Sequence, residues 1–95
     1  MARHGIIVTI LGKQWELVFR KKLDENNCGE CDSPDTPRKK IRIRSGMRKE
    51  LELDTTIHEL LHAAGWHIDE VFVTQFATDA AAILTRLGWT KREDS

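Results

Sequence analysis

The stretch Thr55-Thr-Ile-His-Glu-Leu-Leu-His-Ala-Ala-Gly65 decides how the rest of this sequence is interpreted. It contains the pattern H-E-x-x-H, formed by His58, Glu59 and His62. On a helix, positions i and i+4 lie on one face about one turn apart, so two imidazoles at this spacing can hold one zinc ion from the same side. The glutamate between them lies near the metal without binding it, where it can take a proton from a zinc-bound water. The motif therefore predicts a zinc site with a general base beside it.

Local signals predict a helix around this motif. Asp54 suits an N-cap, Thr56 with Glu59 fits a capping box, and Gly65 fits the position just after a helix. The apolar residues follow helical spacing and would bury one face: Ile57, Leu60, Leu61 and Ala64. We therefore expect the motif helix to begin at Asp54, with residues 46–53 leading into it.

Three strands are expected upstream of the helix. Gly5–Leu11 is rich in β-branched residues, and Gln14–Lys21 alternates between apolar and polar side chains. The two residues Gly12 and Lys13 between them predict a hairpin turn. Ile41–Ser45 is a short alternating segment, with Ile41 and Ile43 directed inward. These segments predict a small three-stranded sheet that packs on the helices, in an α+β fold.

Residues 23–40 are predicted to form a loop, because turn-forming residues dominate them. Cys28 and Cys31 lie in this loop with the spacing C-x-x-C. A single pair of this kind is a weak signal, and we interpret both as ordinary loop thiols. A second metal site or a labile disulfide are the alternatives.

A second helix is expected over residues 69–87, and it ends at Gly88. Its apolar stripe is formed by Phe72, Phe76, Ala80, Ile83 and Leu87, widened by Val73, Ala77 and Leu84. Trp89 can fold back onto the last turn, and residues 90–95 form a polar tail. The 95 residues are thus expected to form one domain.

A catalytic zinc site has three protein ligands and an open position, so one more ligand is needed. The short connection between the two helices predicts an antiparallel pair, in which His62 and Glu70 stand at similar height. Glu70 is therefore the favoured third ligand. His67, Asp69 and Asp79 remain alternatives, and Asp79 can instead accept the free N–H of a ligating histidine.

The charge and hydrophobicity of the sequence limit the classes of function that the chain could have. The formal net charge is zero, so global charge predicts neither nucleic-acid nor membrane binding. The basic stretch, residues 38–49, is interpreted as a solvated edge strand, with guidance of an acidic substrate or of nucleic acid as the alternative. The sequence has no apolar run of membrane-spanning length and no signal-peptide pattern, so we expect a cytoplasmic protein.

His58–His62, followed at once by a glutamate-led helix, resembles the zincin superfamily in its glutamate-ligand branch. The likeness is to the very small metallopeptidases found in bacteriophage genomes, and it covers about residues 41–87. Glu70–Ala77 is also similar to the downstream helix of the ImmA/IrrE-type peptidases, in which an acid six residues before an F-A pair supplies the third ligand. The resemblance implies a minimal zincin-like domain, in the host-cell cytoplasm if the chain is phage-encoded. A metzincin is disfavoured, because that pattern needs a histidine where Ile68 stands.

We therefore expect a zinc-dependent peptidase. One zinc ion is held by His58, His62 and Glu70, with Glu59 as general base and a peptide or protein as substrate. Ile41–Ser45 is expected to line the cleft and to pair with an extended substrate. The alternative is a non-catalytic, zinc-stabilised binding or regulatory module that acts on a host or phage partner.

Overall fold

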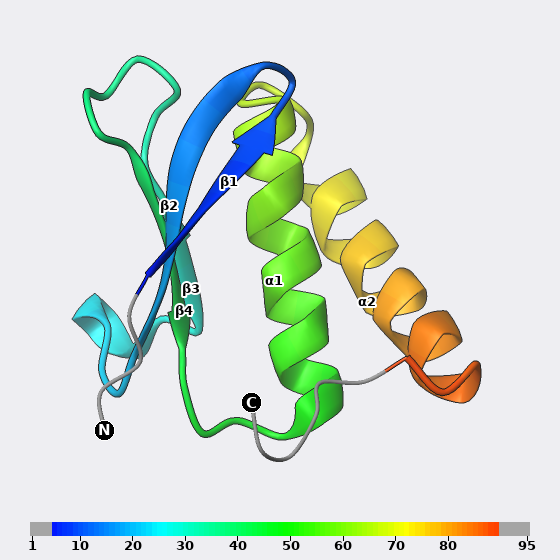
Figure 1. The fold of residues 1–95 in the computed structure, drawn as a ribbon. Coiled ribbons are helices and arrows are strands. Elements are labelled where there is room, and N and C mark those ends of the chain that lie inside the picture. The colour runs from blue at the N-terminus through cyan, green and yellow to red at the C-terminus, as the bar shows by residue number, and fades with distance from the viewer. Residues whose placement is uncertain (1–4, 90–95) are drawn as a thin grey trace.

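The first two strands form the predicted hairpin. The structure is a computed structural model that describes residues 5–89, and in it β1 (Ile6–Ile10) pairs antiparallel with β2 (Lys13–Arg20) (Figure 1). The turn residues are Leu11 and Gly12, with φ of 48° and 80°. A tight hairpin turn with positive φ at both central positions matches the twist of the strands. The hairpin prediction is confirmed, with the turn one residue earlier than expected.

The sheet has four strands, so the prediction of three was wrong. β3 (Gly29–Cys31) pairs antiparallel with β4 (Lys40–Arg44), β4 runs parallel to β2, and the order is β1-β2-β4-β3. β3 lies inside residues 23–40, which were predicted to form a loop. Three residues are too short for an alternating pattern, and β3 exists because its backbone pairs with β4. A 3-10 turn at Asp24–Asn26 precedes it.

β4 lies inside the sheet and not at its edge. Both of its sides are paired, with β2 and with β3. The prediction that Ile41–Ser45 is an edge strand able to pair with a substrate was therefore wrong. The edge of the sheet on this side is β3, which packs beside the motif helix.

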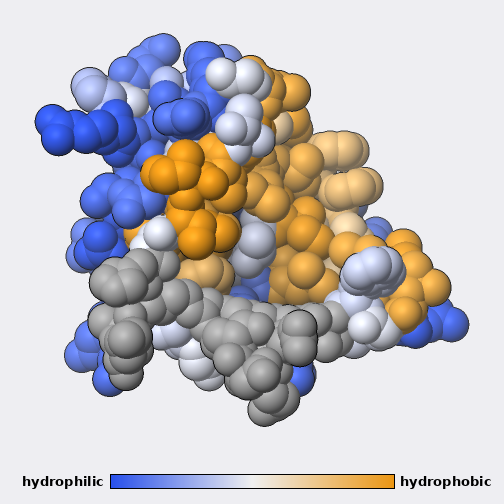
Figure 2. Space-filling view, in the orientation of Figure 1, coloured by the Kyte–Doolittle hydropathy of each residue, from blue (hydrophilic) through white to orange (hydrophobic). Residues whose placement is uncertain are grey.

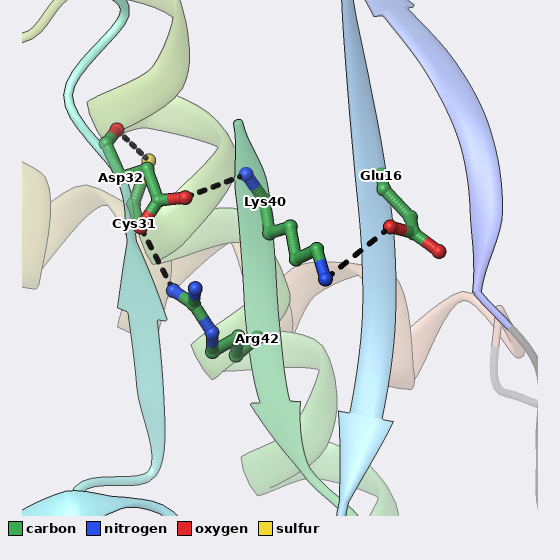
Figure 3. Close-up of polar contacts among 5 residues, drawn as sticks. All are labelled: Glu16, Cys31, Asp32, Lys40 and Arg42. Carbon is green, nitrogen blue, oxygen red and sulfur yellow. Dashed lines mark hydrogen bonds and ion pairs between the residues drawn. The ribbon is translucent and has the colours of Figure 1, made fainter. Parts of the chain in front are cut away.

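Two basic side chains of β4, Lys40 and Arg42, lie beside acidic partners (Figure 3). Lys40 Nζ lies 3.7 Å from Glu16 Oε1, and Arg42 Nη1 donates to Asp32 Oδ1 at 2.8 Å. The backbone N–H of Lys40 also donates to Asp32 Oδ2 at 2.9 Å. Partial burial opposes ionisation of Asp32, but the hydrogen bonds from Arg42 and Lys40 outweigh it, so the pKa of this carboxyl lies below its ordinary value. These contacts neutralise part of the basic stretch.

The core lies between the sheet and α1 (Lys49–Ala64). Parallel pairing of β2 with β4 places Ile41 opposite Leu17 and Ile43 opposite Phe19. Residues paired in this way share one face of the sheet. Ile41 and Ile43 are fully buried there, as the alternation predicted. The cluster of buried residues consists of Trp15, Ile41, Ile43 and Ala63.

α1 begins five residues before the predicted start, so the predicted cap at Asp54 was wrong. Asp54 lies inside the helix and accepts a hydrogen bond from Thr78 at 3.0 Å. Thr56 donates to the Glu52 carbonyl at 2.8 Å and takes no part in a capping box. The residues before the motif, Lys-Glu-Leu-Glu-Leu, are strong helix formers, and the helix extends through the local capping signal. The end at Gly65 is confirmed by its N–H bond to the Leu61 carbonyl.

α2 (Glu70–Arg86) agrees with the predicted second helix to within one residue at each end. Asp69 caps it by accepting from the Phe72 N–H at 3.0 Å. Gly88, with φ of 90°, ends it, and the Gly88 and Trp89 N–H groups bond back to Thr85 and Leu84. The predicted polar tail, residues 90–95, lies outside the described residues. None of the helices that the structure describes is long and apolar enough to cross a membrane.

Candidate metal centre

α1 presents the motif on two of its sides. Thr55, Glu59 and Ala63 lie one turn apart and are buried. His58 and His62 lie on the neighbouring flank and are half-buried. Their Nε2 atoms are 3.2 Å apart. The i, i+4 spacing thus brings the two imidazoles together, as predicted.

Glu70, in the first turn of α2, completes the group. Its Oε1 lies 2.9 Å from His62 Nε2, and its Oε2 lies 3.2 Å from His58 Nε2. One ligand atom from each of the three residues lies within 4.8 Å of the others. The antiparallel arrangement of α1 and α2 brings Glu70 level with the histidines, which is the reason it was favoured from the sequence.

The alternative third ligands lie elsewhere. Asp69 uses its carboxylate to cap α2. Asp79 borders a shallow surface depression with Thr74 and Thr78, on the side of α2 that faces solvent. His67 is exposed in the connection between the helices. Within residues 5–89, neither it nor the two aspartates join the His58, His62 and Glu70 group.

The contacts between the donor groups of these three residues are close to the spacing around one zinc ion. Zinc–ligand distances of about 2.0–2.2 Å with tetrahedral angles place neighbouring donors about 3.3 Å apart. His62 Nε2 lies 2.9 Å from Oε1 of Glu70, His58 Nε2 lies 3.2 Å from its Oε2, and the two Nε2 atoms are 3.2 Å apart, so both carboxylate oxygens face the histidines. Two imidazole nitrogens and one carboxylate oxygen are also a donor set that zinc prefers. Glu70 is the exposed member, with 64% of its side chain accessible, so one side of the group is open to solvent.

Glu59 is a buried acid beside this group. It is 8% exposed, and burial, followed by the negative charges of Glu70 and Glu30, raises its pKa to about 7. The side chain borders two open cavities. One, of about 330 Å³, is lined by Cys31, Glu59, His62 and Trp66. The other, of about 210 Å³, includes His58 in its lining. A carboxyl with this pKa can accept or release a proton near neutral pH.

β3 contributes parts of the site that sequence reasoning missed. A Cβ at Gly29 would lie 2.7 Å from Thr55 Cγ2 and 2.9 Å from Glu59 Cγ, so the glycine lets β3 approach α1 closely. Cys31 lines the larger cavity. No pattern in residues 23–40 points to either contact, because both depend on the pairing of β3 with β4.

Cys28 and Cys31 are free cysteines in the structure. Burial, followed by the nearby carboxylates of Glu59 and Asp32, raises the pKa of Cys31 to about 12, against the opposing charge of Arg42. The Cys31 thiol is therefore protonated at neutral pH, and it donates to the Asp32 carbonyl at 3.3 Å. Among the described residues, neither cysteine belongs to a group that could hold a metal.

The arrangement combines three convergent ligand atoms, an acid that titrates near neutrality and open space beside both. Comparison of the chain with protein-family models, with curated proteins and with solved structures finds no match in any of the three. The chemistry of the site is therefore inferred from its own residues.

Proposed function

We propose that this chain is a zinc-dependent metallopeptidase with a minimal zincin-like fold. The observation that carries the proposal is the convergence of His58, His62 and Glu70 on one point, with the buried Glu59 beside them. His58, His62 and Glu70 would hold one zinc ion. An open side remains for water and for a substrate carbonyl.

The residues around the ion have separate tasks in this proposal. When bound, zinc supplies a Lewis acid that polarises a carbonyl and lowers the pKa of water. Glu59 takes the proton of the attacking water and delivers it to the amine nitrogen of the leaving peptide. Its pKa, raised by burial, suits both halves of that transfer. The cavity lined by Cys31, His62 and Trp66 would receive a substrate side chain.

The free edge of β3 is the proposed place for the substrate backbone. β3 is the last strand of the sheet, and it lies beside α1. An extended peptide can add to such an edge through main-chain hydrogen bonds. We assign this role to β3 and not to β4, because β4 is already paired with β2 on one side and with β3 on the other.

The test is a Glu59→Gln variant, with zinc content and peptide hydrolysis measured on the same preparations. We expect one zinc ion per chain in wild type and variant alike, because Glu59 is not a ligand. Turnover should fall by about 10²–10⁴-fold, since the general base is lost. Glu25→Gln is the matched control, because Glu25 is exposed in the loop before β3. Undiminished cleavage by Glu59→Gln, or a wild-type protein without zinc, contradicts the proposal.

A zinc-stabilised binding module is the second candidate, and one feature favours it. The proposed ligands join α1 to α2, and α2 packs on α1 rather than on the sheet. A metal there would fasten α2 to the rest of the fold. Zinc binding without hydrolysis of any peptide, together with unfolding on chelation, would support this module over the peptidase. A nucleic-acid regulator is less favoured, because Glu16 and Asp32 neutralise part of the basic stretch.

A further inference from the structure

The apolar stripe of α2 is wider than the surface that α1 covers. Val73, Ala77 and Ala81 are buried against α1. The larger members of the predicted stripe are exposed instead: Phe72 53%, Phe76 48%, Ile83 57% and Leu87 67%. Figure 2 shows hydrophobic residues gathered over the helices and continuing toward the hairpin. Such a continuous apolar face indicates an interaction surface.

The spacing of the exposed stripe is that of a helix-pairing seam. The exposed Phe76, Ile83 and Leu87 and the half-buried Ala80 between them stand at positions 76, 80, 83 and 87, which are four, three and four residues apart. This is the alternation of a and d positions in a heptad, which lets one helix pack along another. Ala80 is small, and so leaves room in the seam for a large side chain from a second helix.

The charges beside the seam show which partner fits. Asp79 and Arg86 are both exposed and are seven residues apart, so they occupy the same flanking position, g, of successive heptads. Within residues 5–89 neither side chain is engaged in an ion pair. The flank thus carries one charge of each sign at equivalent places.

We propose that the partner is a second copy of this chain, with the two α2 helices antiparallel across a twofold axis. In this register Phe76 of one copy meets Leu87 of the other, and Ala80 meets Ile83. Asp79 then faces Arg86 of the second copy, and symmetry repeats this pair. In a parallel pair each g position would instead lie beside an e position of the second copy, and the e positions Ala77 and Leu84 are apolar, so only the antiparallel dimer pairs the two charges.

The available area suits a dimer of modest affinity. The exposed parts of Phe72, Phe76, Ile83 and Leu87 amount to on the order of 500 Å² per copy, given about 150–250 Å² for an aromatic side chain. Two such patches bury on the order of 1,000 Å², which is the lower bound for a specific interface. Because the formal net charge is zero, two copies of the chain experience no net long-range repulsion.

Sedimentation equilibrium of the full chain tests the proposal. We expect the mass to approach twice the 10.9 kDa of one chain at about 1 mM and to fall on dilution. Asp79→Arg and Arg86→Asp should each weaken self-association about tenfold, because each creates two like-charge pairs. An equimolar mixture of the two variants should form a heterodimer, since every pair across the seam is then of opposite sign. Asp35→Arg, the same substitution at an exposed loop position, should leave the wild-type mass unchanged.

Three results would overturn the dimer as described. The first is a wild-type chain that stays monomeric at about 1 mM. The second is self-association that neither charge reversal weakens, and the third is a failure of the mixed variants to associate. Ile83→Lys provides a further variant that does not depend on the charges, and it should abolish the dimer. Because these measurements are of mass, their outcome is independent of whether the chain binds zinc or hydrolyses peptides.

Discussion

At the scale of single residues, Glu59 links stability to chemistry. Its carboxyl is buried beneath β3, near the negative charges of Glu70 and Glu30. The folded protein therefore holds a proton there up to about pH 7, whereas the unfolded chain releases it near the ordinary value of 4.5. An acid with a raised pKa in the fold stabilises the fold at low pH and loses that contribution as the pH rises.

The metal-free protein should become less stable between about pH 4.5 and pH 7 because of this residue. The loss is up to roughly 3 kcal/mol, since one pKa unit corresponds to about 1.4 kcal/mol. Glu59→Gln cannot titrate, so its free energy of unfolding should vary less over the same range. Urea unfolding of both proteins in a chelator, at several pH values, measures the difference. If the free energies of unfolding of wild type and Glu59→Gln change with pH in the same way, burial of the Glu59 carboxylate has no such cost.

At the scale of elements, β3 is the part of the fold that holds Glu59 in place. The strand passes so close to α1 that residue 29 has no room for a side chain. Gly46, between β4 and α1, differs, because a Cβ there would have no atom within 4 Å, although its φ is +84°. A substitution at Gly29 therefore tests close packing, whereas a substitution at Gly46 tests only the positive-φ backbone.

Gly29→Ala should destabilise the protein by about 1–3 kcal/mol, because Thr55 and Glu59 must move to accommodate the methyl group. Peptide hydrolysis should fall as well, since the general base is displaced. Gly46→Ala is the control, with a cost of about 1 kcal/mol from its left-handed backbone and no loss of hydrolysis. Denaturant unfolding and turnover of both variants provide the comparison. A Gly29→Ala variant with wild-type stability and turnover would rule out the close contact.

Sequence patterns correctly predicted those elements whose structure depends on residues close together in the chain. The β1–β2 hairpin, the end of α1 at Gly65 and the extent of α2 follow from alternation, glycine and helical spacing. The convergence of Glu70 with the histidines was predictable because only a short turn separates the helices. β3 and the parallel pairing of β2 with β4 were not predictable in this way, since distant partners determine both. The start of α1 was misplaced because a capping signal does not interrupt strong helix formers.

At the scale of the whole molecule, the core and the candidate metal centre are separate. The buried cluster around Trp15, Ile41 and Ile43 lies between the sheet and α1. The candidate ligands come from α1 and from the first turn of α2, and these two helices pack side by side (Figure 1). We therefore expect the sheet to fold onto α1 without the metal.

Chelation should accordingly lower the melting temperature without unfolding the protein. Metal at about 100 times its dissociation constant adds about 2.7 kcal/mol, and about 4–8 °C follows from each kcal/mol in a domain of this size. We expect a decrease of no more than roughly 10–20 °C, with the far-ultraviolet circular dichroism retained at 20 °C. Glu70→Ala, which removes one ligand, should show a smaller change with chelator. Complete loss of structure on chelation would instead favour the zinc-stabilised binding module.

The three candidate ligands belong to one short segment, residues 58–70. Few chain bonds separate them, so a denatured copy of the polypeptide would itself act as a weak chelator. Added zinc would then bind both conformations, and its benefit to the native one would level off as the concentration rises. Thermal scans over a zinc titration would accordingly reach a plateau, in contrast to a centre whose ligands are scattered along the chain.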